Sequence, residues 1–249
     1  MAVSDSSASG APFSGSIPVL YERLLVPMIF AEPAQRTARR VGEACPATLL
    51  ETAAGTGVLT RALAGMCLET DIVATDLNQS MLDVAERRQH KADRVRWQQA
   101  DALDLPFAEA GRVLRPGRPL FLTVWDRVER NELAGAVIEA LRAQPHTSAF
   151  DFLARTPHGY ADQDRIRMDL ERAGLPVVSI TSARGTCATT ADDAALAYCQ
   201  GTPIRHEIEA DEHLDLVSAT AAVTAALTDR YGTGTFSVPT GWLEIRAHA

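Results

Sequence analysis

Two carboxylates and a pair of glycines are spaced so that together they could hold a ligand. Glu51 follows a short apolar run, Gly55 and Gly57 come next, and Asp76 closes the following apolar run. Glycines between a strand and a helix let bare backbone approach a ligand, because they carry no side chain. In nucleotide-binding β-α-β units an acid after the second strand holds ribose hydroxyls. The pattern predicts a nucleoside-containing ligand, although a lone Gly-x-Gly pair also suits a purely structural turn.

The charge of Glu51 narrows the choice of ligand. The dinucleotide fingerprint needs a third glycine where this chain has Thr60, and it places a pyrophosphate at the start of the helix. A carboxylate at Glu51 would repel that anion. It favours instead a ligand that carries an ammonium and a sulfonium group. A nucleotide-dependent oxidoreductase is therefore the remote alternative.

Three successive motifs carry a resemblance to a known family. They run from Thr48 to Gly57, from Asp76 to Leu82 and from Asp101 to Phe107. Their order and spacing resemble those of the class I S-adenosylmethionine-dependent methyltransferases, with the best match over Thr48 to Asp126. Within this class they are most similar to the small-molecule group of quinone-biosynthesis enzymes, methyltransferase type 11. The resemblance implies S-adenosyl-L-methionine as the cofactor and a small-molecule methyl acceptor.

The same resemblance implies a set of cofactor-binding residues. Asp76 would hold both ribose hydroxyls, Asp101 would accept from the adenine amino group, and Leu77 would touch the adenine. Tyr21 would contribute from an N-terminal helix over the site, although it also fits the border of an apolar helical stripe. The full predicted set is Tyr21, Glu51, Ala53, Gly55, Gly57, Asp76, Leu77, Asp101 and Ala102.

Methyl transfer asks little of the protein as acid or base, because a sulfonium is already an activated electrophile. Positioning and exclusion of water are the main contributions, so the catalytic residues stay unassigned. His158 and His206 are candidate bases if the acceptor is a hydroxyl, and each also fits a solvated histidine. The four cysteines form no Cys-x-x-Cys pair and have no histidine at ligand spacing, so no metal site is predicted.

After Phe107 the chain departs from the family pattern. Phe107 runs directly into Ala108 to Gly117, where the family has an acidic turn, a fourth strand and a loop, of the order of 20 to 30 residues. The fourth strand is therefore predicted to be missing. A short helix at Ala108 to Leu114 would then deliver the next strand, Pro119 to Asp126, beside the first. A methyltransferase-fold protein that binds cofactor or a partner without turnover is the alternative function.

The predicted fold is α/β, a Rossmann-like doubly wound sheet with an antiparallel terminal hairpin and a helical lid. The chain of 249 residues divides into a flexible tail over 1–17 and a single methyltransferase-like domain over 18–249. That domain is predicted to contain N-terminal helices (18–46), a cofactor-binding core (47–126) and helical or lid insertions (130–175 and 188–232). The predicted elements include helices at 19–30, 33–44, 132–141, 163–173, 191–200 and 204–229, and strands at 95–100, 119–126, 176–181 and 236–248.

Charge and hydropathy limit the partners. A net charge of -8 argues against a surface that binds nucleic acid. No apolar run is long enough to span a bilayer, and the first residues lack the basic flank and apolar core of a secretory signal. We therefore predict a cytoplasmic protein whose partner is a small molecule, with no nucleic acid and no membrane. The oligomeric state is open, and Pro239 suits an edge position on the last strand through which a homodimer could pair.

Overall fold

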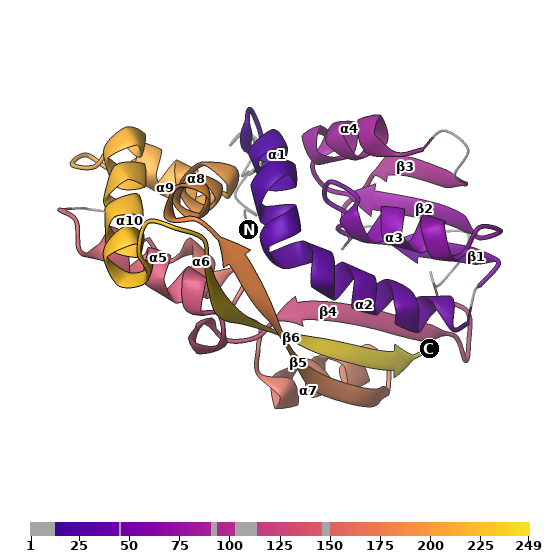
Figure 1. Ribbon diagram of the computed structural model, residues 1–249. Coiled ribbons are helices and arrows are strands. Elements are labelled where there is room, and N and C mark those ends of the chain that lie inside the picture. The colour runs from indigo at the N-terminus through magenta and orange to yellow at the C-terminus, as the bar shows by residue number, and fades with distance from the viewer. Residues whose placement is uncertain (1–12, 45, 91–93, 103–113, 146–149) are drawn as a thin grey trace, which may run out of the picture.

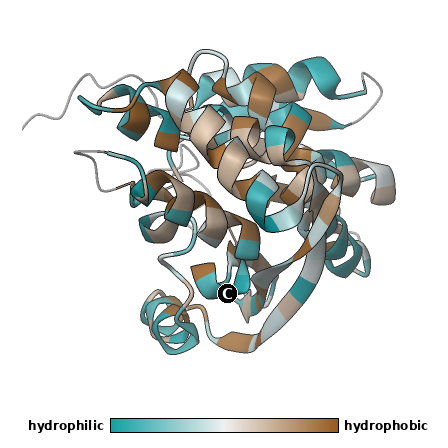
Figure 2. Ribbon diagram, turned by 60° about the vertical axis from the view of Figure 1, so that its left-hand side comes forward, coloured by the Kyte–Doolittle hydropathy of each residue, from teal (hydrophilic) through white to brown (hydrophobic). Residues whose placement is uncertain are grey.

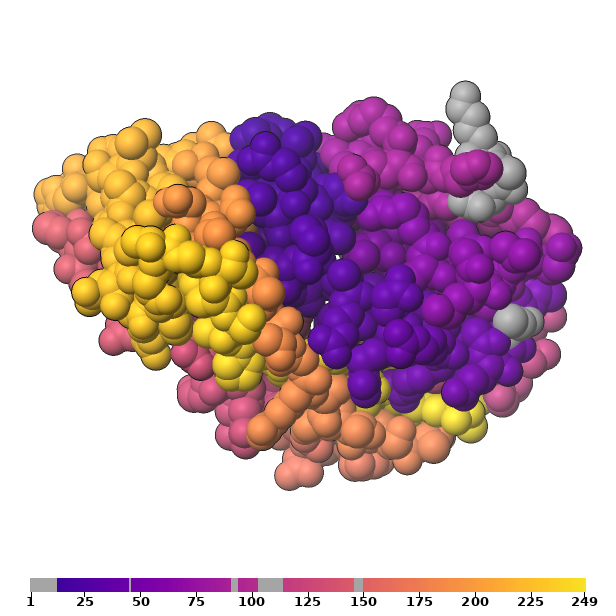
Figure 3. Space-filling view, in the orientation of Figure 1, coloured from indigo at the N-terminus to yellow at the C-terminus, as the bar shows by residue number. Residues whose placement is uncertain are grey.

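The described part of the chain forms two separate three-stranded sheets with helices packed around them (Figure 1). The computed structural model describes residues 13–44, 46–90, 94–102, 114–145 and 150–249. One sheet is parallel and the other antiparallel, so the predicted α/β class is confirmed. In the space-filling view the N-terminal helices, in indigo, lie between the C-terminal segments, in orange and yellow, and the half that contains the parallel sheet (Figure 3).

The parallel sheet follows the predicted strand, loop and helix order. Its strands are β1 (Thr48–Glu51), β2 (Asp71–Asp76) and β3 (Val95–Gln99), in the order β1-β2-β3, with α3 (Val58–Met66) and α4 (Gln79–Arg88) as crossovers. Each crossover helix buries an apolar face, which includes Leu63 on α3 and Met81 on α4. Because the strands run the same way, their carboxyl ends meet at one edge of the sheet.

The antiparallel sheet contains the predicted terminal hairpin. Its strands are β4 (Pro119–Trp125), β5 (Val177–Thr189) and β6 (Phe236–His248), in the order β4-β6-β5. Strand β5 continues beyond its predicted end at residue 181, because Ala183, Cys187 and Thr189 keep the two-residue period of buried side chains. Strand β6 lies in the middle of the sheet, and Pro239 is in register with Thr186 of β5. Strand β4 pairs with β6 only from Trp242 to His248, so at Pro239 the strand has β5 on one side and no described strand on the other. The homodimer through this edge stays a prediction.

The N-terminal segment is helical without a break, whereas the sequence predicts two helices that separate before Pro33. It consists of α1 (Ile17–Leu20), the wide-turned helix η1 (Tyr21–Phe30) and α2 (Ala31–Gly42). Pro27 lies inside η1, where the Ala31 N–H reaches back five residues to the carbonyl of Val26. Pro33 falls in the first turn of α2, a position that tolerates a missing N–H. Neither proline therefore ends the helix.

The remaining helices pack on the antiparallel sheet and on one another. They are η3 (Val128–Arg130), α5 (Glu132–Arg142), α6 (Phe152–Arg155), α7 (Gln163–Arg172), α8 (Ala191–Gly201), α9 (Ile204–Glu209) and α10 (Leu216–Tyr231). Their hydrophobic and hydrophilic residues alternate along the ribbon (Figure 2), and α5, α8 and α10 share one apolar core. The single helix predicted over 204–229 is wrong, because the Asp215 side chain caps the N–H groups of Val217 and Ser218 and begins α10 anew.

The two sheets do not share a strand. Among the described residues β1 pairs only with β2 and β4 only with β6, so the prediction that residues 119–126 lie beside the first strand is wrong. The junction after Phe107 and, apart from Leu114, the helix predicted at 108–114 lie outside the described residues. Leu49 of β1 and Phe121 of β4 are half-buried, and both pack against the core that α2 and α3 form.

Helix α2 joins the two halves. Thr37 Oγ1 lies 2.9 Å from Thr123 Oγ1 of β4, and Arg36 Nε lies 2.6 Å from a carboxylate oxygen of Glu244 on β6. Toward the parallel half, α2 makes an apolar contact instead, because Ala38 and Val41 pack with the buried side chains of α3. Helix α2 thus covers apolar side chains at the two strand edges and fixes one sheet relative to the other (Figure 1).

Candidate functional site

The glycine loop after β1 is tied to the end of β2 through Asp76. The Gly55 N–H donates to Asp76 Oδ2 at 2.8 Å, and the Asn78 N–H donates to Asp76 Oδ1 at 2.8 Å. The Ala54 N–H also donates to the carbonyl of Thr75 at 2.9 Å. Asn78 Nδ2 also donates to Oδ1, at 3.3 Å. A carboxylate offers about four acceptor positions, so a ligand's hydroxyls can take the position left on Oδ2 of the buried Asp76 and replace the longer Asn78 Nδ2 bond at Oδ1.

The backbone of the loop requires small residues. Ala53, Gly55 and Gly57 all have positive φ, of 54°, 57° and 80°. A Cβ on Gly57 would lie 2.6 Å from the Trp97 ring, so only glycine fits there. Ala53 pays a conformational cost in this region, and such strain clusters at ligand-binding sites. Of these predicted residues, Ala53 is exposed at the loop surface while Gly57 is buried where α3 begins.

Glu51 is a buried carboxylate at the end of β1. Thr60 Oγ1 donates to Glu51 Oε2 at 2.7 Å. Burial raises the pKa of Glu51 from 4.5 to about 7, against the lowering effects of Thr60 and Arg61. A cationic ligand group beside Glu51 would favour its ionised form. Thr60, which interrupts the dinucleotide pattern in the sequence, is the residue that orients this carboxylate.

The other predicted cofactor residues meet at the same sheet edge or above it. Leu77 is about half exposed after β2, and its carbonyl accepts from Gln99 Nε2 at 2.8 Å. Asp101 and Ala102 are exposed just beyond β3, which pairs with β2 as far as Gln99. The structure therefore brings all three to the carboxyl edge beside Asp76.

Helix η1 lies over the loop and carries Tyr21. Burial and, next, the Asp76 carboxylate raise the pKa of Tyr21 well above its usual value. The next residue, Glu22, is buried and pairs with Arg61 of α3 at 2.8 Å and Arg88 of α4 at 2.7 Å. Sequence reasoning missed Glu22, because one glutamate on a helix has no signal that separates it from a solvated one.

The two candidate bases occupy different places. His158 is half-buried beside Trp125 at the end of β4, with 6.2 Å between ring centroids, and its Nδ1 lies 2.7 Å from the carbonyl oxygen of Asp126. His206 lies on α9 with 45% of its side chain exposed and Nδ1 3.7 Å from Glu209. Of the two candidates, His158 is the more buried and has an oriented ring.

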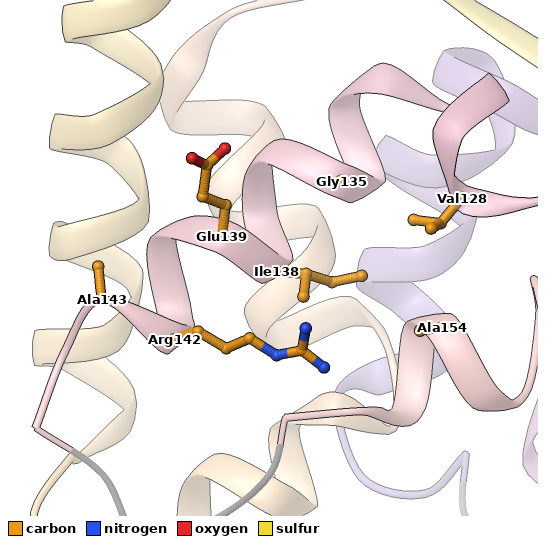
Figure 4. A pocket seen from close by; sticks show the side chains of 7 residues that line it. All are labelled: Val128, Gly135, Ile138, Glu139, Arg142, Ala143 and Ala154. Atoms are coloured by element: carbon orange, nitrogen blue, oxygen red, sulfur yellow. The ribbon is translucent and has the colours of Figure 1, made fainter.

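A separate cavity of about 460 Å³ lies beside α5 and α6 (Figure 4). Its walls include Val128, Ile138 and Ala154, with Glu139 and Arg142 at its border. The Glu139 carboxylate is paired with Arg230 at 3.2 Å. This cavity is distinct from the glycine loop. Within the described part of the chain, no cluster of three His, Cys, Asp or Glu side chains could hold a metal ion, and no helix is long and apolar enough to cross a membrane.

Sequence comparison places this site in a methyltransferase segment. Residues 49–117 match the methyltransferase domain family. The chain is 42% identical over 71 residues to a demethylmenaquinone methyltransferase of Clavibacter sepedonicus, covering 28% of each chain. It is 26% identical over 157 residues to an acetylaranotin bis-thiomethyltransferase of Aspergillus terreus, covering 55% of this chain and 57% of that one. Both matches span less than two thirds of the relative's length.

Solved structures extend the similarity to the whole fold. A candidate methyltransferase from Bacillus halodurans superposes with a TM-score of 0.51 at 18% identity, covering 86% of this chain and 97% of that chain. A structure described for the conversion of a disulfide bond into a thioacetal group during echinomycin biosynthesis has a TM-score of 0.50 at 16% identity, covering 87% and 81%. Residues 49–117 thus match a methyltransferase domain, and the protein has the Rossmann-like fold of methyltransferases of known structure.

Proposed function

We propose that this protein binds S-adenosyl-L-methionine across the ends of β1 and β2 and transfers its methyl group to a small molecule. The observation that carries the proposal is the pair of buried carboxylates, Glu51 and Asp76, on either side of a glycine loop. The pair suits a cationic nucleoside and would repel a phosphate. When bound, the cofactor supplies a methyl group on a sulfonium.

Each residue then has a role in holding the ligand. Asp76 accepts from the two ribose hydroxyls, Glu51 faces the ammonium group, and the exposed acid Asp101 accepts from the adenine amino group. Gly55 keeps the loop backbone clear for the methionine chain, while Gly57 leaves room for the Trp97 ring behind the loop. The protein's contribution to the displacement is alignment and the exclusion of water. We further propose a cytoplasmic location and a homodimer.

One observation favours a second candidate, a cofactor-binding protein without turnover. The strand ends that would align cofactor and acceptor belong to two sheets that do not pair within the described residues. A displacement of about 1 Å between reacting groups can cost about a hundredfold in rate. Such a protein would still bind the cofactor, because the residues that hold adenosine all belong to the parallel half.

Calorimetry followed by a turnover assay tests both candidates. S-adenosylmethionine should bind, NAD should not, and Glu51→Lys should remove binding by reversing the charge beside the ammonium group. Arg23→Glu, a charge reversal at an exposed position of η1, is the matched control and should bind as the parent does. Tight NAD binding would refute the proposal. Cofactor binding with no methyl transfer to a broad panel of phenols, thiols and amines would establish the second candidate.

A further inference from the structure

Four aromatic rings form a continuous row from the cofactor half to the end of β4. Successive ring centroids are 5.0 Å apart from Tyr21 to Phe30, 5.2 Å from Phe30 to Trp125, and 6.2 Å from Trp125 to His158. All four side chains are half-buried rather than sealed in the core. The row begins beside the glycine loop, since Tyr21 is followed by Glu22, which pairs with Arg61 at 2.8 Å, and Arg61 donates to the Thr56 carbonyl of the loop at 2.6 Å. It therefore runs from the proposed ribose site to the sheet edge where an acceptor would lie.

The histidine at the far end of the row has a defined tautomer. A carbonyl oxygen only accepts, so His158 Nδ1 at 2.7 Å from the Asp126 carbonyl carries the hydrogen. The Nε2 atom makes no hydrogen bond to the described residues. Burial lowers the pKa of His158 below 6.5, against the raising effects of Asp126 and Glu129. In the neutral ring Nε2 thus presents a lone pair.

The carbonyl that orients His158 is itself held rigidly. Asn131 Nδ2 donates to the same Asp126 oxygen at 3.1 Å and to the carbonyl of Gly241 at 3.0 Å. Asn131 Oδ1 accepts from the Gly241 N–H at 3.1 Å, which anchors the group to β6. On the other side, a Cβ at Gly159 would overlap the carbonyl oxygen of Arg155, so the turn after His158 requires glycine. These contacts fix where the imidazole points.

We propose that the methyl acceptor is a planar aromatic hydroxyl that lies against Trp125, and that His158 Nε2 takes its proton. This rests on the proposed function and names its substrate class. The O–H bond breaks and its proton moves to Nε2, while the oxygen forms a bond to the methyl carbon and the carbon–sulfur bond breaks. The sulfonium becomes a neutral thioether, so charge is conserved when the imidazolium forms. The Asp126 carbonyl stabilises that imidazolium through the existing Nδ1–H bond.

Aromatic rings favour a planar substrate, because stacked or edge-to-face pairs with centroids at 4.5 to 7 Å contribute beyond simple burial. A poised neutral base is useful for a hydroxyl that is protonated at neutral pH. A thiol or an activated ring carbon would need it far less. The combination of Trp125 and a neutral His158 therefore favours an aromatic alcohol over those acceptors.

The experiment combines binding and turnover with three probes, 2-naphthol, 2-naphthalenethiol and 4-nitrophenol. Quenching of tryptophan fluorescence reports binding of 2-naphthol without cofactor. Trp125→Leu should remove most of this quenching, while Trp97→Leu should not.

Methylation is followed with labelled S-adenosylmethionine. His158→Gln should lower kcat for 2-naphthol by about 10² to 10⁴-fold. It should affect 4-nitrophenol much less when both phenols are assayed at about pH 8, because 4-nitrophenol is then largely ionised whereas 2-naphthol is not.

Controls separate this inference from the proposed function. His206→Gln should match the parent, and calorimetry should give His158→Gln the parent's affinity for cofactor, which also shows that it folds. Absence of cofactor binding in the parent would refute the proposed function, while the fluorescence assay would still decide the aromatic site. The inference fails if the parent methylates the thiol but not 2-naphthol, if it binds cofactor but methylates none of the probes, or if His158→Gln keeps full activity on 2-naphthol.

Discussion

The parallel and antiparallel halves build their sites in different ways. In the parallel half, Glu51, Gly55 and Asp76 stand at the ends of two consecutive strands, and short hydrogen bonds join loop to strand. In the antiparallel half, His158 is oriented by a carbonyl that Asn131 ties to Gly241, 110 positions further along the chain. Local sequence determines the first site, and tertiary folding assembles the second.

Each half contains a buried glutamate, Glu51 or Glu244, and the two differ in whether an arginine of the protein pairs with the carboxylate. Burial raises the pKa of Glu51 to about 7, because it outweighs the lowering effects of the Thr60 hydrogen bond and the nearby Arg61 charge. Burial also acts on Glu244, but the hydrogen bond from Arg36 holds the pKa of that carboxyl below its usual value. Glu51 is thus prepared for a cation that the protein does not itself supply, whereas Glu244 is already paired.

The largest expected effect is the pH dependence of stability due to Glu51. The unfolded chain ionises Glu51 above about pH 4.5, while the folded protein keeps the proton up to about pH 7. The folded state therefore binds more protons in this window, and stability falls as pH rises through it, by about 3 kcal/mol. Glu51→Gln should remove this part of the decline when urea unfolding is compared at pH 5 and pH 8.

A matched control is Glu69→Gln, which changes an exposed carboxylate of the same half. It should keep the parent's pH dependence. If Glu51→Gln loses as much stability between pH 5 and pH 8 as the parent, then Glu51 is ionised in the folded protein. The contrast with Glu244 would then disappear.

The next effect concerns the affinity for cofactor. Asp76→Ala should weaken S-adenosylmethionine binding by about 2 to 3 kcal/mol, roughly thirtyfold to a hundredfold, because a buried charged acceptor is lost. The Gly55 and Asn78 N–H groups also lose their acceptor, so the loop is less ordered. Calorimetry measures the change, with the exposed Asp83→Ala as control. Unchanged affinity in Asp76→Ala would remove the ribose assignment.

These two predictions rest on residues that the sequence alone identifies, and the reason is physical. Strand, glycine loop and helix follow one another, so Glu51, Gly55, Gly57 and Asp76 are recognisable from type and spacing. The antiparallel pairing of the terminal strands was also predictable. The division of the sheet was not, because whether β1 and β4 pair depends on how α2 packs between them.

Other site residues left no local signal. Asn131 and Glu22 act through partners distant in sequence, and a polar residue on a helix or at its start normally faces water. The continuity of the helix from Phe30 into Ala31 was also missed, because Pro33 falls in the first turn of α2 and does not end the segment. For Asn131 and Glu22 the contact that decides the structure is tertiary.

A smaller effect should separate the two halves. Asn131→Ala removes donors to the Asp126 and Gly241 carbonyls and the acceptor for Thr240 Oγ1. Unsatisfied buried groups cost about 1 to 3 kcal/mol each, and partial relaxation should leave a net loss of about 2 kcal/mol in urea unfolding. Cofactor affinity should stay at the parent's value, because the network lies wholly in the antiparallel half. A loss of affinity like that of Asp76→Ala would show that the halves are coupled.

The smallest expected effect tests the contact between the N-terminal helices and each half. Glu22 joins η1 to α3 and α4 through Arg61 and Arg88, whose side chains are 24% and 58% exposed. These arginines can return to water when the charge is removed, so Glu22→Gln should cost only about 1 kcal/mol, between the values for exposed and buried pairs. Because η1 places Tyr21 over the loop, that loss should appear as about fivefold weaker cofactor binding.

Glu244→Gln is the matched change on the other side, since it weakens the contact of α2 with β6. It should lower stability and leave cofactor affinity unchanged. If both variants weaken cofactor binding equally, then η1 and α2 move as one body and the halves are not independent.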